Sequence, residues 1–540
     1  MLFFLRVVGV LTVFLTIIHP ALAQSNSTTA SHSASCKILT DAPSAADAAY
    51  WRGDYKNAAS LYADAFSKDP KDSRSRQNQI DSLIAQNKIE DASNLADAWT
   101  SSEPANPRAI LAASDVRFAE GDWLESYALS LKSQKLDPCM PEVYEAMAQY
   151  EGLAGYRATA RKHILLAHQL APNDRVFRLE WINSLQNHDQ RVAEYTSYIN
   201  DSKTIDEKRK RTLLDQATKW SAESENRCEL VSSTGPATFP MTAIPGAFGI
   251  DSWGIEVALN GKKKILQIDT GASGLFLTKA ATTGTGLTSV EVLRIGGFGD
   301  DAANSATRYR AASVHIAGLE FKNCYVDGLA NFGVMGGGNE MGQRLDDGDG
   351  LIGADVFSRY LVTLDYIRHE VRLEPLPPLP NAGPATSLDP LGGRNDANWM
   401  AVDRYVAPQM QNWTKIYRRD HMLIIPTRIS EANNKLFVAD TGAESNLVDV
   451  KIAHEFTTSK EDILEFRGLS GTTKKSFQTG SFTLDFAGVR LPVKSMSAID
   501  LSRFHGISGF IGYPTLQQLV MHIDYRDNLV LFEAPNSKKN

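Results

Sequence analysis

Two matching stretches decide the fold of the second half of the chain: ILQIDTGA at residues 265–272 and LFVADTGA at residues 436–443. In each, a run of apolar residues typical of a strand ends in Asp-Thr-Gly-Ala, and a shorter apolar stretch follows. One Asp-Thr-Gly alone is weak evidence, because turns are rich in Asp and Gly. The occurrence of the whole pattern twice indicates a duplicated unit.

A second glycine-containing motif follows each Asp-Thr-Gly. The first copy has GLIG at residues 350–353, and the second copy has GFIG at residues 509–512. From these motifs onward the copies align without a gap at an offset of 159 residues, so that Asp365-Tyr366 corresponds to Asp524-Tyr525. The order and spacing of these matches predict two related β units.

This set of motifs resembles the aspartic peptidases of the retropepsin and pepsin type, in which each of two lobes contributes one Asp-Thr-Gly loop with an apolar-apolar-Gly strand behind it. The resemblance covers lobe one at residues 240–377 and lobe two at 416–535, with a linker rich in Pro, Gly and Asn at 378–415. It implies an all-β bilobal fold and an aspartic-type endopeptidase. Asp269 and Asp440 would face each other as the catalytic pair.

The other residues of each loop support this pair. Gly271 and Gly442 bring backbone N–H groups close to the carboxylates, and the resemblance implies that Thr270 and Thr441 grip the opposite loop by hydrogen bonds. Two carboxylates a few ångströms apart cannot both ionise, so they share one proton over a wide pH range. The charged member takes a proton from a bound water, while the protonated member hydrogen-bonds the scissile carbonyl. The copies are too alike to show which Asp is the base.

The residue after each Asp-Thr-Gly bears on the pH optimum. Pepsin-type members often have Ser or Thr there, and its hydroxyl hydrogen-bonds the carboxylate. Ala272 and Ala443 lack that hydroxyl, as in the retroviral type. Because loss of a hydrogen bond to the charged form raises a carboxyl pKa, we expect a pH optimum nearer mildly acidic or neutral than strongly acidic.

Glycine-rich segments follow both loops at corresponding places. The first copy has Gly296 and Gly297 in the run RIGGFG, and the second has Gly468 and Gly471 in the run RGLSG. They resemble flap hairpins that close over a bound peptide. The alternative is that they are ordinary hairpin turns.

The first half of the chain carries a helical repeat, in which Gly or Asn recurs every 34 residues and Pro keeps the same step in a second phase. The turn-phase residues are Gly53, Asn87, Gly121 and Gly155, and the Pro-phase residues are Pro70, Pro104, Pro138 and Pro172. Gly tolerates the positive φ of a tight turn between helices, and Pro stops the second helix of a pair. The pattern resembles the tetratricopeptide repeat.

We expect tetratricopeptide-like helical repeats over residues 40–222, with a degenerate fifth copy over 181–200 and a capping helix at 205–222. A solenoid of this kind has a concave surface for peptides or proteins, so a protein substrate or partner is expected to dock there. The repeats have two alternative roles. They could be a structural platform for the second half, or they could carry the function of a binding protein with non-cleaving peptidase-like lobes. Both Asp-Thr-Gly loops are intact, which argues against the last reading.

The N-terminus predicts the compartment. Residues 1–23 combine a single charged residue, Arg6, with an apolar run and a small-residue site for cleavage after Ala23, which is typical of a secretory signal peptide. An uncleaved anchor is the alternative, but a membrane span needs a longer apolar run. We expect an extracytoplasmic protein, periplasmic or secreted, with no stable membrane anchor after cleavage and a flexible leader at 24–39.

That compartment permits disulfides. The chain has four cysteines, Cys36, Cys139, Cys228 and Cys324, which allow three pairings. The sequence does not choose among these pairings, and free buried thiols are an equal alternative.

Composition narrows the class of function. A length of 540 residues favours several domains, and 43% apolar with 22% charged residues is typical of a globular protein. The net charge of -7 gives no support for a nucleic-acid partner. No motif calls for a metal or an organic cofactor, and we expect none. The sequence leaves open whether the lobes pair within one chain or between chains.

Overall fold

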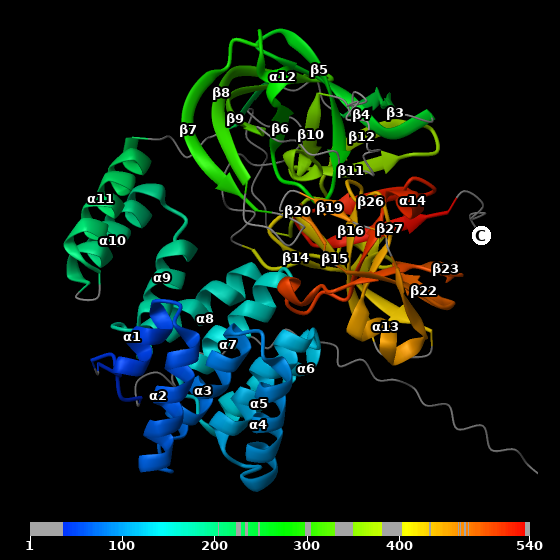
Figure 1. Ribbon diagram of the computed structural model, residues 1–540. Helices are drawn as coiled ribbons and strands as arrows, with labels where there is room; N and C mark the ends of the chain where they lie inside the picture. The colour runs from blue at the N-terminus through cyan, green and yellow to red at the C-terminus, as the bar shows by residue number, and fades with distance from the viewer. Residues whose placement is uncertain are drawn as a thin grey trace, which may run out of the picture. The chain divides into compact units, whose positions relative to one another are not determined.

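A computed structural model gives the arrangement of the chain (Figure 1). The structure describes residues 36–40, 42–202, 205–222, 228–232, 236–246, 249–296, 304–329, 349–380, 402–430, 434–462, 464, 466–468, 471–473 and 475–534. The predicted signal peptide at 1–23, most of the leader at 24–39, residues 381–401 of the predicted linker and Gly297 lie outside these residues.

The first part of the described chain is helical and appears in blue to teal in Figure 1. Its helices are α1 (Ala45–Trp51), α2 (Tyr55–Lys68), α3 (Ser73–Ala85), α4 (Ile89–Ser102), α5 (Pro107–Glu120), α6 (Trp123–Leu136), α7 (Pro141–Leu153), α8 (Arg157–Leu170), α9 (Arg175–Ser184), α10 (His188–Asp201) and α11 (Glu207–Ala222).

The residues of the two sequence phases lie at the helix ends, as predicted. Gly53, Asn87, Gly121 and Gly155 each separate the two helices of a pair and have φ values of 80°, 60°, 92° and 87°. Each Pro-phase residue follows the last residue of a second helix by two positions, as Pro70 does after α2. The helical repeat is therefore confirmed.

The fifth repeat differs from the expectation. The range 181–200 is not one helix, because α9 ends at Ser184 and α10 begins at His188. The side chain of Asn187 accepts a hydrogen bond from the backbone N–H of Gln190 at 2.8 Å, which caps the new helix. The break therefore lies just before Asp189, which is 34 residues after the turn-phase residue Gly155.

The rest of the described chain is rich in strands and forms two β units. The first β unit contains β1 (Glu229–Ser232), β2 (Ala237–Pro240), β3 (Thr242–Gly246), β4 (Gly249–Leu259), β5 (Lys262–Asp269), β6 (Leu275–Thr278), α12 (Lys279–Thr282), β7 (Thr288–Ile295), β8 (Asn304–Ile316), β9 (Leu319–Leu329), β10 (Gly350–Gly353), β11 (Tyr360–Asp365) and β12 (Glu370–Pro375). The second β unit contains β13 (Thr414–Lys415), β14 (Tyr417–Arg419), β15 (Met422–Ile429), β16 (Asn434–Asp440), β17 (Leu447–Asp449), α13 (Val450–Phe456), β18 (Ser459–Asp462), β19 (Arg467–Gly468), β20 (Gly471–Thr472), β21 (Ser476–Thr479), β22 (Phe482–Phe486), β23 (Val489–Val493), β24 (Ser497–Ile499), β25 (Gly509–Gly512), α14 (Tyr513–Leu516), β26 (Val520–Asp524) and β27 (Leu529–Glu533).

The two β units repeat one strand motif. In the first, β5 pairs in parallel with β10 and places Asp269 opposite Gly353, while β6 pairs antiparallel with the other edge of β10. In the second, β16 pairs in parallel with β25 and places Asp440 opposite Gly512, and β17 pairs antiparallel with β25. The duplicated sequence pattern thus corresponds to a duplicated strand arrangement.

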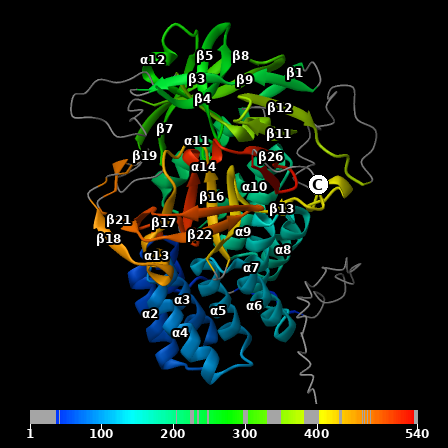
Figure 2. The same ribbon diagram turned by 90° about the vertical axis from the view of Figure 1, so that its right-hand side faces the viewer.

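A six-stranded sheet joins the two units, in the order β13-β27-β26-β11-β12-β2. At its centre β11 and β26 are antiparallel neighbours (Figure 2). Thr363 lies opposite His522, and these residues are 159 positions apart, which is the offset between the two copies. Equivalent strands therefore face each other about a local two-fold axis.

The sheet-rich region extends beyond the ranges expected for the lobes. Strand β1 lies before residue 240 and pairs with β9. Strand β2 ends at residue 240 and pairs with β12. Within the expected linker, β13 pairs with β27. The linker also contacts the repeats, because the Asp403 carboxylate accepts hydrogen bonds from the backbone N–H and the hydroxyl of Thr159 in α8, at 3.0 and 2.7 Å. Strands β1 and β2 have four residues each and β13 has two, which is too short for an alternating pattern to show in the sequence.

The helical repeats pack against the second β unit through a shared apolar core. Trp123 and Tyr150 lie in this core with Ile424 and Phe510. The guanidinium of Arg157 donates to the side-chain oxygen of Asn528 at 2.7 Å. The repeats are therefore part of the folded core of the second β unit.

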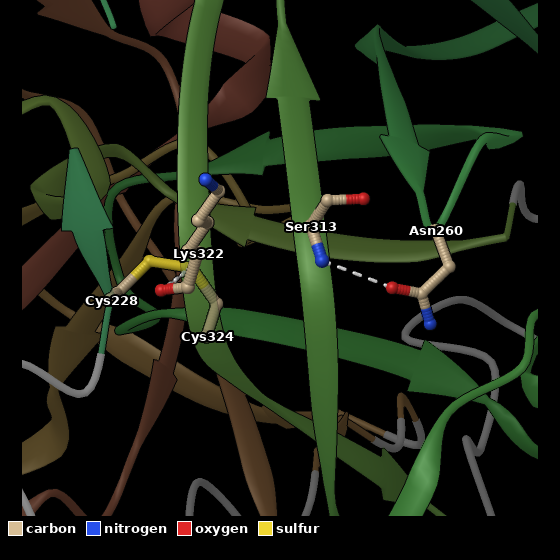
Figure 3. Close-up of a disulfide and its surroundings, with 5 residues drawn as sticks. All are labelled: Cys228, Asn260, Ser313, Lys322 and Cys324. Carbon is tan, nitrogen blue, oxygen red and sulfur yellow. Dashed lines mark hydrogen bonds between the residues drawn. A yellow bond between two sulfur atoms is a disulfide. The ribbon is translucent and has the colours of Figure 1, made fainter. Parts of the chain in front are cut away.

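The disulfide that the structure shows in the first β unit joins Cys228, next to β1, to Cys324 in β9 (Figure 3). Beside it, the backbone N–H of Ser313 donates to the side-chain oxygen of Asn260 at 3.0 Å and secures the neighbouring strand β8. Among the described residues no cysteine is free. The alternative of free thiols is therefore wrong for these residues.

Candidate active site

The two Asp-Thr-Gly loops meet at the junction of the β units. Asp269 and Asp440 are the last residues of β5 and β16. The apolar residues of these strands are buried, among them Ile268 and Ala439, which come directly before the aspartates. Both strands are buried in one common core, which holds them in place and therefore fixes the position of the aspartate at the end of each.

The threonines bind the two loops to each other reciprocally. The hydroxyl of Thr270 donates to the Ala439 carbonyl at 2.8 Å and accepts from the Thr441 N–H at 3.0 Å. The hydroxyl of Thr441 donates to the Ile268 carbonyl at 2.8 Å and accepts from the Thr270 N–H at 3.0 Å. Thr270 is 1% and Thr441 0% exposed. This geometry is the grip that the resemblance implied.

Each carboxyl group lies against the glycine of the opposite loop. A Cβ added at Gly271 would come within 2.5 Å of the Asp440 Cγ, and one added at Gly442 would come within 2.4 Å of the Asp269 Cγ. The glycines also donate within their own loops, from the Gly271 N–H to Asp269 Oδ1 at 2.7 Å and from the Gly442 N–H to Asp440 Oδ1 at 2.9 Å. No larger residue fits against either carboxyl group at these two positions.

The environment favours a single shared proton. Burial raises the pKa of Asp269 well above its ordinary value, and the nearby charge of Asp440 raises it further. Burial also raises the pKa of Asp440, while the Gly442 N–H and a hydrogen bond with Asp269 oppose that shift. Because each carboxyl group acts on the charge of the other across this contact, the two titrate as one unit.

Two side chains at this junction were not identified from the sequence. The imidazole Nε2 of His421 lies 2.8 Å from the carbonyl oxygen of Gly271 in the opposite loop. In the other direction, the side-chain amide of Gln267 donates to the Thr441 carbonyl at 3.5 Å. Gln267 could have been noticed as the polar residue inside an apolar strand. His421 had no such signal, because its contact joins residues 150 positions apart.

The residues after each loop are held differently in the two β units. Asp355 accepts from the Ser273 hydroxyl at 2.7 Å and from the Gly274 N–H at 3.1 Å. In the second unit the side-chain oxygen of Asn446 accepts from the Gly512 N–H at 2.8 Å. These contacts fix the residues after both loops, with a carboxyl group as the acceptor in one unit and a side-chain amide in the other.

The flap candidates lie at or beside hairpins. Gly296 directly follows β7, which pairs antiparallel with β8. Gly468 pairs with Gly471 in the two-stranded β19–β20 ladder. The flap role stays a prediction, as does the alternative of ordinary hairpin turns.

The helical repeats contain a second candidate site, a cavity of about 480 Å³. Carboxylates and aromatic rings line it together, including Asp81, Asp115, Glu145, Tyr62 and Phe177. Burial raises the pKa of Asp81 to about 8, and the charge of Glu145 raises it as well. Burial and the charge of Asp81 raise the pKa of Asp115 well above its ordinary value. We call this cavity the acidic groove.

In the part of the chain that the structure describes, no group of His, Cys, Asp and Glu side chains is arranged to hold a metal ion. Among the same residues, no helix has the length and apolar character that crossing a bilayer requires.

Comparison with known proteins bears on the helical part. A family model described as "Tetratricopeptide repeat" matches residues 52–115. A solved structure, a thermophilic TPR protein from Thermus thermophilus, is 14% identical over 32% of this chain and 94% of its own, with a TM-score of 0.26. No curated protein matches the chain. The chain thus contains tetratricopeptide-like helical repeats, of a kind that commonly mediates protein–protein interaction, followed by a sheet-rich region.

Proposed function

We propose that the sheet-rich region is a bilobal aspartic-type endopeptidase, with one active site formed by both β units of a single chain. The observation that carries the proposal is the reciprocal grip of Thr270 and Thr441, which holds the buried carboxyl group of Asp269 close to the half-buried carboxyl group of Asp440. Two carboxyl groups held this close destabilise the fold unless they share a proton, and a shared proton is what hydrolysis of a peptide bond by water requires.

The mechanism follows from the shared proton. The charged carboxyl takes a proton from a water bound between Asp269 and Asp440, and the oxygen of that water attacks the peptide carbonyl carbon. The protonated carboxyl hydrogen-bonds the carbonyl oxygen as negative charge develops on it. A proton then passes to the leaving amine. The raised pKa of both aspartates supports activity at mildly acidic to neutral pH.

The helical repeats supply the proposed docking surface. The acidic groove combines carboxyl groups with aromatic rings, so a substrate or partner segment carrying Lys or Arg favours the charged form of these carboxyl groups and stacks on the rings. The signal-like residues 1–23 support a periplasmic or secreted location. Sequencing the N-terminus of the mature chain tests that location, and an N-terminus at Gln24 is the expected result.

Cleavage of casein tests the activity, with the fragments identified by mass spectrometry over the range from about pH 3 to 8, which spans the titration of ordinary and raised carboxyl groups. Wild type is expected to cleave, and Asp269→Asn and Asp440→Asn are both expected to be inactive. Asp485→Asn is the matched control, because that carboxylate pairs with Arg428 at the surface of the second β unit. Absence of cleavage by wild type at every pH would favour the alternative, a non-catalytic peptide-binding scaffold.

A further inference from the structure

A short hairpin connects the helical repeats to the active-site loop. It consists of β14 and the start of β15, with Arg419 opposite Met422 and the turn at Asp420-His421. Asp420 has a φ of 53°, the left-handed conformation of a tight turn. We call residues 417–422 the β14–β15 hairpin. Neighbouring side chains of this hairpin contact different parts of the molecule.

One end of the hairpin is fixed by the repeats. The ring of Tyr417 lies edge-on to those of Trp123 and Tyr150, with centroids 5.0 and 5.8 Å apart. The guanidinium of Arg419 lies 5.5 Å from the centre of the Trp123 ring and donates to the His505 carbonyl at 3.4 Å. Arg419 also lines the acidic groove. The aromatic contacts therefore set where the hairpin lies against α6 and α7.

The middle of the hairpin is fixed by the second β unit. The guanidinium of Arg418 donates to the carbonyl oxygens of Tyr525 and Asp420 and lies 5.0 Å from the centre of the Tyr525 ring. Tyr525 is fully buried. The turn that carries His421 is thus held by Arg418 on one side and by the repeats on the other.

The tip of the hairpin reaches the catalytic pair. The Nε2 of His421 contacts the Gly271 carbonyl at 2.8 Å, and Gly271 is the residue that lies against the Asp440 carboxyl group. The N–H of the same glycine donates to Asp269 at 2.7 Å. A shift of Gly271 therefore changes the position of both carboxyl groups at once.

We propose that His421 is a positioning residue of the active site, and that the docking of the repeats on the β14–β15 hairpin holds it in place. This inference rests on the proposed peptidase function. It gives the repeats a second role besides docking, because the catalytic rate then depends on contacts between Tyr417 and the helices. His421 acts through Gly271 and not on the substrate.

Substitutions in the full-length chain separate positioning from simple stability. His421→Leu removes the donor, and we expect kcat to fall about tenfold with little change in KM, the usual scale for a lost positioning hydrogen bond. His421→Gln keeps an N–H donor at the same reach and is expected to stay within about threefold of wild type. His454→Gln is the matched control, because that histidine hydrogen-bonds Ser459 on the outside of the same β unit.

A double-mutant cycle tests the link to the repeats. Tyr417→Leu removes the aromatic contacts with Trp123 and Tyr150 and is expected to lower kcat severalfold. The double variant with His421→Leu should be no slower than His421→Leu alone, because both changes act through one contact. Independent, multiplying effects would overturn the link. An unchanged kcat in His421→Leu, or an equal loss in His421→Gln, would overturn the positioning role.

Hydrogen exchange provides a readout that does not depend on catalysis. We expect faster amide exchange of residues 270–272 in His421→Leu and Tyr417→Leu than in wild type, and no change in His421→Gln. Unchanged exchange in both Leu variants overturns the inference even where wild type is active. If wild type cleaves nothing while exchange rises as expected, the peptidase proposal fails and the structural link between the repeats and the loop stands.

Discussion

Gly442 offers the sharpest single perturbation of the catalytic pair. A Cβ at this position would lie 2.4 Å from the Asp269 Cγ and 2.4 Å from its Oδ2. Ordinary contact begins near 3.4 Å, so Gly442→Ala must displace the Asp269 carboxyl group by about 1 Å. Misplacement of a reacting group by that amount costs on the order of 100-fold in rate. Because the same crowding strains a packed interior, we also expect a loss of about 1–3 kcal/mol of stability.

The assay for Gly442→Ala is the initial rate of casein cleavage, together with the urea midpoint of unfolding. Gly152→Ala serves as the control, because Gly152 lies in α7 and nothing lies within 4 Å of an added Cβ. That change should leave the rate unaltered and raise the stability by about 0.5–1 kcal/mol. A Gly442→Ala enzyme with the wild-type rate would refute the view that the two carboxyl groups are in close contact across this glycine.

Three further changes have defined outcomes. Thr270→Val removes the buried hydroxyl that donates to the Ala439 carbonyl and should lower stability by about 1–3 kcal/mol in urea unfolding, whereas Thr270→Ser should lose much less. Asp269→Asn should raise the thermal midpoint above about pH 4, where an unfolded Asp is charged. The raised native pKa means that the folded chain holds the proton more tightly and loses stability as the pH rises, so the gain should vanish at lower pH. Replacing Cys228 and Cys324 by Ser opens a link across 96 residues and should cost about 4–5 kcal/mol in unfolding experiments, and an unchanged midpoint would refute this expectation.

Local sequence patterns predicted the parts of the fold that depend on local backbone geometry. The 34-residue step identified Gly53 and its equivalents, because a tight interhelical turn needs positive φ wherever it occurs. The repeated Asp-Thr-Gly predicted two equivalent loops, and the structure places Asp269 and Asp440 together. Both kinds of signal lie within short stretches of chain.

Features built from distant residues could not be predicted in this way. His421 reaches Gly271 only because the β14–β15 hairpin packs on the repeats, and no local pattern reports that contact. The acidic groove likewise collects Asp81 and Asp115 from neighbouring repeats, where each is an ordinary helical residue in the sequence. The early strand β2 was missed because it is only four residues long, and its partner, β12, follows more than a hundred residues later.

In the proposed peptidase, Asp269 and Asp440 of one chain form one active site. The most direct test is the casein cleavage rate of Asp269→Asn, of Asp440→Asn and of an equimolar mixture of the two, each compared with wild type. We expect cleavage by wild type and none by either variant or by the mixture, because every chain in the mixture carries a broken pair. Activity in either single variant, or activity restored by mixing, would contradict this expectation.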